Sequence, residues 1–326
     1  MSHISALHEI MATRVWLATP ALVHATRDMF INNVGLRTPI EKIRAEHYKT
    51  ASLPSLTCKE PITFHAVQVE DGQTHEEAKG YYAIDTVVTD PYTKEAQTAF
   101  VHVMEVWGGI LRNSGACSEG SMDQRDELKD AADDGALAHI IVVNSGGGQA
   151  SSLLDYEDGI NYCRDHGQPV VVFVRGMACS CAYGLSAMSD YIFASSRADI
   201  VGCIGAMGAG FTNKDGDEHA VTHETYRELY ATKSVNKNII HRDIAQGDYE
   251  KWQADLDEWE ERFNGIVTKY RPAVADDQKD GLDYEAGAVV GTLVDEIGDF
   301  QQAYEKAVAL AEDAQLASRQ QGTKAE

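Results

Sequence analysis

Ser180 lies where an apolar strand pattern meets a helical one. It sits between Cys179 and Cys181, after "VVVFVRG" and before "AYGLSAMSD". The dipole and free N–H groups of a first helical turn favour negative charge that develops at such a position. Serine is also a common helix N-cap. The pattern therefore predicts either a cap or a nucleophile, and a nucleophilic hydroxyl needs a base.

Three glycines, residues 146–148, follow a second apolar strand pattern, "AHIIVVNS". Without a Cβ, their N–H groups can approach a ligand closely. Such donors form oxyanion holes, where each contributes ~3 to 4 kcal/mol. A phosphate site is the alternative, but neither G-x-x-x-x-G-K-[ST] nor G-x-G-x-x-G follows. Because parallel strands present their carboxyl ends to one edge, we expect both turns to face one site.

The base can be a histidine or a lysine that burial keeps neutral. None of the twelve histidines follows an obvious core strand with an aspartate placed to orient it, and His139 precedes its strand. Lys233 and Lys237 lie in "RELYATKSVNKNIIHRD", just after the β-like "RELYA". Most lysines are solvated surface charges, but a Ser–Lys dyad requires no third group. These two lysines are therefore the candidates.

The segments around these residues alternate between strand and helix patterns. Helical patterns occur in "DQRDELKDAADDGA", "SSLLDYEDGINYCRDHG" and "SCAYGLSAMSD", and strand patterns in "AHIIVVNS", "PVVVFVRG", "YIFAS" and "IVGCIGAMG". Nearly continuous apolar strands need cover on both faces. The fold class is therefore α/β, with a parallel sheet flanked by helices.

Changes of pattern along the chain predict four regions. They are an N-terminal helical extension (1–60), a β-rich connecting segment (61–97), the main domain (98–312) and a flexible tail (313–326). Within the main domain, apolar spacing predicts a helix over 248–270. Its stripe, which includes Trp252, Trp259 and Phe263, is typical of a core or a subunit interface.

Composition excludes several classes of function. The formal net charge of −23 disfavours binding to nucleic acid or to anionic membrane surfaces. No window approaches the ~18 to 20 apolar residues of a membrane span, and the N-terminus does not resemble a signal peptide. The six dispersed cysteines predict reduced thiols in a cytoplasm. Cys179 and Cys181 lack the C-x-x-C spacing of a metal or redox site.

Five ordered blocks resemble those of the signal peptide peptidase A (protease IV) family of serine peptidases. The blocks are "NSGGG", "RGMACSCAYGLSAMSDYIFA", "IVGCIGAMG", "YATKSVNKN" and "YEAGAVVGTLVDEIGDFQQA". The resemblance covers about residues 98–310, and the order is more specific than any single block. The chain is particularly similar to the soluble branch that phages and prophages encode as head-maturation proteases, whose short N-terminal segment resembles "VWLATPALV".

The resemblance implies a Clp protease/crotonase-like fold of repeated β-β-α units and a Ser–Lys dyad. Ser180 matches the family nucleophile. Lys237 matches the general base, with Lys233 as the fallback because the loop length leaves the alignment open by a few residues.

The same resemblance implies an oxyanion hole. Gly147 and Gly148 match the glycines of the family's "SPGG", and the N–H of Cys181 is the implied further donor. Two departures bear on this site. Gly146 replaces the usual proline, and Cys181-Ala182 replaces the usual glycine pair after the serine.

The implied function is a serine endopeptidase, without a cofactor or metal, that processes phage capsid or scaffold proteins or other cytoplasmic polypeptides. A ring or dome of identical subunits is expected, with no nucleic-acid or membrane partner. Two alternatives stay open. One is a crotonase-like acyl-CoA enzyme that shares the fold and the glycines, and the other is an inactive structural relative in phage head assembly.

Overall fold

The structure is a computed structural model that describes residues 16–18, 64–68, 80–89, 95–115, 119–209, 225 and 227–322. The strands are β1 (Trp16–Ala18), β2 (Phe64–Gln68), β3 (Gly80–Thr89), β4 (Ala96–Trp107), β5 (Ala138–Ser145), β6 (Gly147–Gln149), β7 (Val170–Cys179), β8 (Tyr191–Ala194), β9 (Ile200–Gly202), β10 (Asp283–Glu285) and β11 (Glu296–Ile297). The helices are α4 (Ser121–Asp133), α5 (Ser152–Asp165), α6 (Cys181–Ala187), α7 (Ile239–Ala245), α8 (Glu250–Tyr270) and α9 (Phe300–Gly322), with 3-10 turns at Asp276–Gln278 and Ala286–Ala288.

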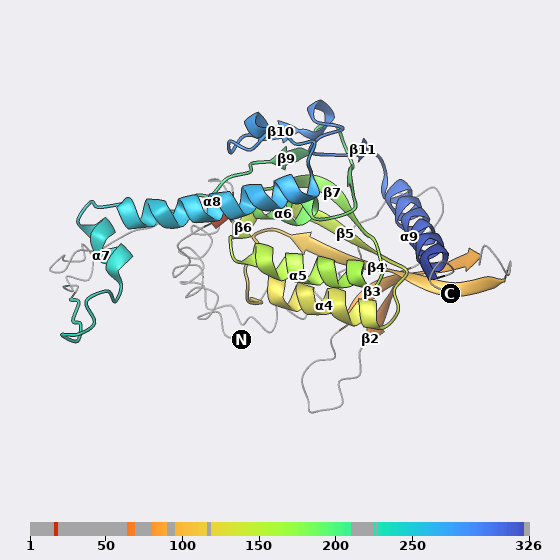
Figure 1. The fold of residues 1–326 in the computed structure, drawn as a ribbon, viewed down its shortest axis with the longest axis horizontal. Coiled ribbons are helices and arrows are strands. Elements are labelled where there is room, and N and C mark those ends of the chain that lie inside the picture. The colour runs from red at the N-terminus through yellow and green to blue at the C-terminus, as the bar shows by residue number, and fades with distance from the viewer. Residues whose placement is uncertain are drawn as a thin grey trace, which may run out of the picture.

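One nine-stranded sheet organises the described residues, and a small second sheet joins β1 to β6. The centre of the large sheet is parallel: β4 pairs with β5, β5 with β7, and β7 with both β8 and β9. The strands β2, β3 and β4 pair antiparallel and extend the sheet at one end (Figure 1). The parallel centre agrees with the predicted α/β class.

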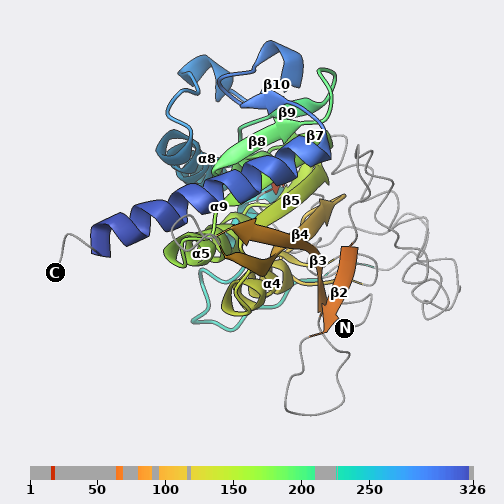
Figure 2. The same ribbon diagram turned by 90° about the vertical axis from the view of Figure 1, so that its right-hand side faces the viewer.

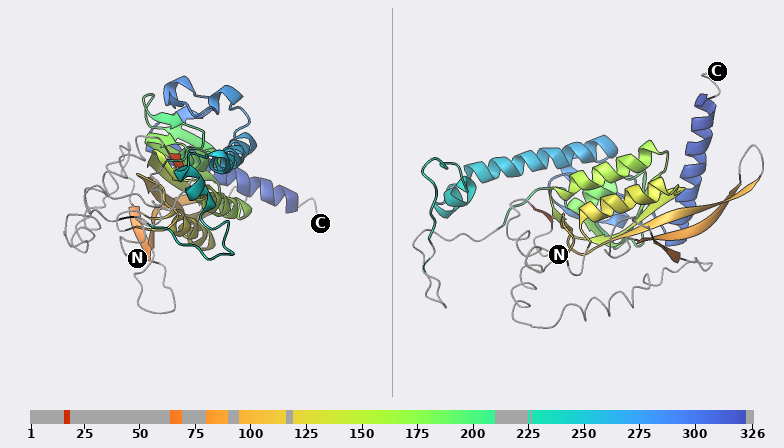
Figure 3. Two further views of the ribbon diagram at one scale, coloured as in Figure 1. Left: turned by 90° about the vertical axis from the view of Figure 1, so that its left-hand side faces the viewer. Right: turned by 90° about the horizontal axis from the view of Figure 1, so that it is seen from below.

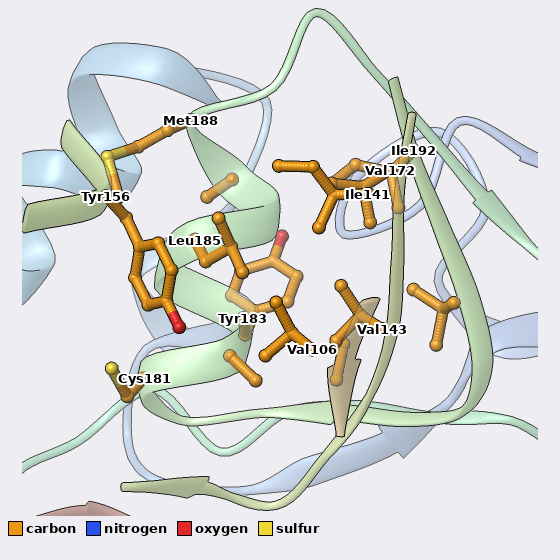
Figure 4. Packing of buried hydrophobic residues seen from close by; sticks show 14 of the residues in the cluster. Val106, Ile141, Val143, Tyr156, Val172, Cys181, Tyr183, Leu185, Met188 and Ile192 are labelled. Atoms are coloured by element: carbon orange, nitrogen blue, oxygen red, sulfur yellow. The ribbon is translucent and has the colours of Figure 1, made fainter. Parts of the chain in front are cut away.

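Helices cover both faces of the parallel strands, as the apolar runs predict. Alternate residues of β5 and β7 enter two different cores. Ile141 and Val172 pack on the side of α4, α5, α6 and α8, whereas Ile140 and Val171 pack with Phe300 of α9 on the other side. Figure 2 shows α9 lying across the strands, and Figure 4 shows the first core around α6.

Most predicted elements are confirmed in the main domain. Each of the helical and strand patterns from "DQRDELKDAADDGA" to "IVGCIGAMG" forms the predicted kind of element, and α8 occupies Glu250–Tyr270 within the range predicted. The β-like "RELYA" is different, because residues 227–231 form no strand. Polar residues flank the few apolar residues of this segment, so it has no continuous apolar run to pack in the sheet.

Three structural features bear on the predicted regions, whose boundaries stay predictions. The sheet begins at β2, so residues 61–97 include part of the main sheet and are not only a connector. Residues 16–18 form a strand within the predicted helical extension, whose other residues lie outside those described. Thr19 precedes a proline, which disfavours helix there. At the other end, α9 continues to residue 322, within the predicted tail.

Among the described residues, no helix combines the length and the apolarity needed to cross a membrane. The two longest, α8 and α9, carry charged residues along their exposed sides.

Candidate active site

Ser180 occupies the turn between β7 and α6 in a conformation that L-residues rarely adopt. Its φ is 54° and its ψ is −123°. Such backbone typically costs ~1 to 3 kcal/mol and persists where the surrounding structure imposes it. Here the amide of Ser180 donates to the carbonyl of Gly202 at 2.7 Å, and its carbonyl accepts from the amide of Gly184 at 2.9 Å. The turn is therefore held from both sides.

The side chain of Ser180 does not cap α6. An N-cap residue ordinarily has extended backbone and accepts a hydrogen bond from the first turn, but the Ser180 side chain makes no capping bond. Ser180 is 1% exposed, and its hydroxyl has no hydrogen-bond partner among the residues that the structure describes. A buried hydroxyl without a partner costs ~1 to 3 kcal/mol. The structure therefore gives no support to the cap, and the role of Ser180 as a nucleophile stays a prediction.

The structure brings the glycine turn next to Ser180. The strands β5 and β7 are neighbours, and their register joins Ser145 to Ala178 at their carboxyl ends. Cys181, directly after Ser180, donates its thiol to the carbonyl of Gln149 at 3.6 Å. The two glycine-rich turns thus lie at one edge of the sheet, as the sequence predicts.

Gly147 and Gly148 begin β6, and both positions favour glycine. Gly147 has φ of +101°, which is the left-handed region that favours glycine. A Cβ on Gly148 would lie 2.0 Å from the carbonyl oxygen of Ile110. The strand therefore depends on two glycines for its conformation and its close packing.

The amide of Gly147 already has an acceptor. It donates to the hydroxyl of Ser145 at 3.1 Å. Cys181 begins α6, and the first amides of a helix have no acceptor within the helix. The Cys181 amide is thus better placed than that of Gly147, and the Gly148 amide is available only where β1 does not pair with it. The role of all three amides in an oxyanion hole stays a prediction.

Burial keeps the two flanking thiols out of the chemistry. It raises the pKa of Cys179 to about 12 and that of Cys181 well above its usual range. Both thiols are therefore protonated at neutral pH, and a thiol is a much weaker nucleophile than a thiolate. The hydroxyl between them is the candidate nucleophile.

The structure does not bring either predicted lysine to Ser180 within one chain. Lys233 and Lys237 are exposed and precede α7. Phe263 lies under α6, where its ring edge would be 3.0 Å from a Cβ on Gly184. The start of α8 lies ~20 Å along the helix from Phe263, since thirteen residues rise 1.5 Å each. The α7 end of α8 projects beyond the sheet layers (Figures 1 and 3).

The helix stripe that includes Trp252 and Trp259 is divided between core and surface. Phe263 is fully buried within the chain, whereas Trp252 and Trp259 are half-buried. Phe263 is therefore core rather than interface, and the two tryptophans remain partly exposed in the single chain.

Sequence reasoning missed two residues that shape the site. Gly202 supplies the carbonyl that holds the Ser180 amide, and Ser145 supplies the hydroxyl that holds the Gly147 amide. Gly202 lies in the block "IVGCIGAMG", which is one of the five blocks of the family resemblance, but nothing in that block predicts its hydrogen bond to Ser180. Ser145 is simply the residue that ends β5.

Comparisons with known proteins point to a family of peptidases. Residues 163–314 match the model of peptidase family S49, a range that includes Ser180 and both lysines but not the glycine turn. The match supports this family, that of signal peptide peptidase A and protease 4, and with it a serine peptidase, which is a hydrolase.

In sequence, the chain is similar to Protease 4 of Haemophilus influenzae. The two are 29% identical over 220 residues, and the match covers 63% of this chain and 35% of the relative. The chain thus spans about a third of the length of that curated relative.

Two solved structures are also similar. One is a serine-to-alanine mutant of the 1510-N membrane-bound stomatin-specific protease, with a TM-score of 0.33, 17% identity, and coverage of 63% of this chain and 83% of that one. The other is a lysine-to-alanine mutant of the same protease in complex with a substrate peptide, with a TM-score of 0.33, 14% identity, and coverage of 63% and 78%.

Proposed function

We propose that this protein is a serine endopeptidase whose nucleophile is Ser180. The observation that carries the proposal is the Ser180 turn itself, with positive φ, a buried hydroxyl and, within the described part of the chain, no hydrogen-bond partner for that hydroxyl. An unpaired hydroxyl on strained backbone at a strand-to-helix turn is costly for a purely structural residue. The same geometry points a serine at a reacting carbonyl in enzymes with a nucleophile elbow.

The proposed reaction uses the amides beside the Ser180 hydroxyl and a lysine that another copy of the chain supplies. A neutral lysine accepts the proton of Ser180, and the oxygen attacks a peptide carbonyl. The amides of Gly148 and Cys181 stabilise the negative oxygen of the tetrahedral intermediate. The lysine then returns the proton to the leaving amine, and water hydrolyses the acyl-enzyme. Desolvation in the closed site favours the neutral form of the lysine.

Lys237 is the proposed base, with Lys233 as the fallback, and a neighbouring copy of the chain is its proposed source. The lysine segment is exposed beside the projecting α7, and three of its apolar neighbours are exposed too: Leu229 by 98%, Val235 by 66% and Tyr249 by 57%. Contact with another subunit would bury this apolar surface and desolvate a lysine at the same time. A homo-oligomer, in a ring or dome, is therefore part of the proposal.

The finer expectations belong to this proposal as well. They are a Clp protease/crotonase-like arrangement, a cytoplasmic location, and processing of phage capsid or scaffold proteins in prohead assembly. The resemblance of "VWLATPALV" to the N-terminal segment of phage members supports the phage branch.

Activity-based labelling tests the nucleophile. Wild-type protein should react with a fluorophosphonate and cleave casein, and Ser180→Ala should lose ~10⁴-fold or more of the cleavage rate, as removal of a catalytic serine does. Ser186→Ala is the matched control, since the Ser186 hydroxyl only donates to the carbonyl of Ala182 at 2.7 Å. Labelling of Ser180→Ala at the wild-type rate would reject the proposal.

Two lysine variants test the base and its source. Lys237→Ala should abolish cleavage, and Lys233→Ala should keep it, whereas the reverse result moves the base to Lys233. Mixing inactive Ser180→Ala with inactive Lys237→Ala should restore activity if the lysine comes from a neighbour, because mixed assemblies then contain complete sites. No recovery in a proven mixed oligomer would contradict a lysine supplied between subunits.

A further inference from the structure

The strand β1 lies on the outer edge of the glycine strand. It pairs antiparallel with β6, with Trp16 opposite Gln149, Leu17 opposite Gly148 and Ala18 opposite Gly147. It also contacts α6, the helix that begins directly after Ser180. In Figure 1 it is the short red strand beside β6. A segment more than a hundred residues away in sequence thus occupies the site edge.

The pairing with β1 occupies the amide and carbonyl groups on the outer edge of β6. On its inner edge β6 is joined to Ile110, whose amide donates to the carbonyl of Gly147 at 3.0 Å and whose carbonyl accepts from the amide of Gln149 at 2.9 Å. Consecutive peptide groups of a strand point to alternate edges. The amide and carbonyl of Gly148 therefore point outward, where Leu17 is the paired residue.

An extended peptide that binds by strand addition needs the same groups. Strand addition uses the free amides and carbonyls of a sheet edge for affinity. At this edge only Gly148 has its peptide groups directed outward, and β1 lies opposite it. A substrate and β1 therefore cannot pair with β6 at once.

The burial of the nucleophile agrees with an occupied site. Ser180 is 1% exposed and its hydroxyl is inaccessible, yet a peptide carbonyl must come within ~3.5 Å of that oxygen to react. Some part of the chain must therefore move before reaction. Of the described elements, β1 contacts both β6 and α6 and belongs to no other sheet.

We propose that the outer edge of β6 is the peptide-binding strand of this enzyme and that β1 of the same chain is its resident occupant. Substrate must displace β1, so the segment is a built-in competitor, and a peptide with its sequence is a ligand of the emptied edge. The inference rests on the proposed peptidase function for its catalytic consequence, but the binding of β1 to β6 is independent of catalysis.

Proline substitutions in the full-length chain separate the paired position from its neighbour. Leu17→Pro removes the amide that faces Gly148, whereas Ala18→Pro changes a residue whose amide faces away from β6. Leu17→Pro should raise the rate of fluorophosphonate labelling about tenfold, the factor that corresponds to ~1.4 kcal/mol of lost pairing. Ala18→Pro should label like wild type. Equal rates for wild type and Leu17→Pro would overturn the proposal.

A reversible crosslink gives the opposite test and does not depend on a proline variant that folds. Trp16→Cys combined with Gln149→Cys joins two paired residues, at a Cα separation that a disulfide can span. Oxidation should stop labelling of Ser180, and reduction should restore it. Trp16→Cys alone controls for the native thiols. Labelling at one rate in both redox states of a crosslinked protein would reject β1 as the occupant.

Peptide binding distinguishes a failure of this proposal from a failure of the proposed function. In a Ser180→Ala background, a fluorescent peptide ATRVWLATPAL (residues 12–22) should bind the Leu17→Pro protein at least about tenfold more tightly than the protein with native β1, by the same arithmetic. The readout is fluorescence anisotropy. Equal affinity for both proteins would overturn the occupancy of β6 by β1, even if the proteins that keep Ser180 are labelled. Tighter binding to the Leu17→Pro protein, together with no labelling of the proteins that keep Ser180, would support the occupancy and reject the peptidase.

Discussion

Two buried polar sites lie at opposite ends of the same parallel strands, and their hydrogen bonding differs completely. At the carboxyl end, no described residue forms a hydrogen bond with the hydroxyl of Ser180. At the other end, four side chains form a continuous chain: His102 Nδ1 lies 3.0 Å from His139 Nδ1, His102 Nε2 lies 3.0 Å from Glu127, and His139 Nε2 lies 2.8 Å from Gln168. A buried polar group whose hydrogen bonds are all made is explained by its structural role, whereas an unpaired one requires another explanation, and the proposed explanation here is catalysis.

The direction of each bond in the chain follows from one amide. The Gln168 side chain donates its Nε2 to the carbonyl of Ala132 at 3.0 Å, so its oxygen faces His139 and accepts from His139 Nε2. A neutral His139 then accepts at Nδ1 from His102. The remaining nitrogen of His102, Nε2, then accepts a hydrogen bond from the O–H of Glu127, whose side chain is therefore a neutral carboxylic acid.

The pKa directions agree with this assignment. Burial lowers the pKa of His102 and of His139 to about 3, with the neighbouring His102 adding to the shift at His139. Burial, and after it the charge of Asp130, raises the pKa of Glu127 to about 8. Tyr81 packs edge-on against His102 at 5.3 Å between ring centroids. Neutral imidazoles and a neutral carboxyl make a chain without buried charge.

The largest expected effect on this comparison comes from breaking the histidine chain. His139→Ala should lower the free energy of unfolding by ~3 kcal/mol, because it leaves a cavity and removes the partners of His102 and Gln168. Labelling of Ser180 per folded molecule should stay close to wild type. Urea unfolding and fluorophosphonate labelling measure the two quantities. A variant that is as stable as wild type but unlabelled would reverse the roles assigned to the two ends.

A smaller effect should depend on pH. The pKa of Glu127 is raised in the folded state, so its stabilising contribution is complete below pH ~4.5 and is lost as pH rises towards 8. The histidines act in the opposite sense, because their lowered pKa removes stability as pH falls from ~6.5 towards 3. The free energy of unfolding should therefore pass through a maximum, falling at acid pH because of the histidines and at alkaline pH because of Glu127.

Glu127→Gln tests the loss of stability at alkaline pH. The amide can still donate to His102 but cannot ionise, so the variant should exceed wild type by at least ~1.4 kcal/mol at pH 8.5, the equivalent of one pKa unit. At pH 5 the two proteins should be nearly equal. Thermal unfolding at both pH values measures this, with Glu258→Gln on exposed α8 as a control. A difference that does not change with pH would contradict a neutral carboxyl at Glu127.

The smallest expected effect concerns the strain at Ser180. Ser180→Gly should raise the free energy of unfolding by ~1 kcal/mol, since glycine adopts φ of 54° without a Cβ penalty and removes the unpaired hydroxyl. Urea unfolding measures the gain. Asn238 also has positive φ, at 56°, so Asn238→Gly controls for backbone strain alone. A loss of stability in Ser180→Gly would mean that the serine side chain stabilises the fold.

Local patterns determined the central part of the fold and the position of the candidate nucleophile. Strands such as "VVVFV" and the spacing along α8 identified their elements because those signals are short-range and periodic. The order of five short blocks, including the turn at Ser180, indicated the peptidase family before any geometry was known. His139 was also placed correctly at the far end, because it precedes its strand.

Only the tertiary structure decided how distant segments meet. The left-handed φ of Ser180 depends on the carbonyl of Gly202, and β1 became a strand because β6 offered an edge, although its own residues predict helix. The exposed position of Lys237 likewise depends on where α8 carries it. Pairing between segments far apart in the chain comes from complementary edges and packing, which no periodicity within one segment encodes.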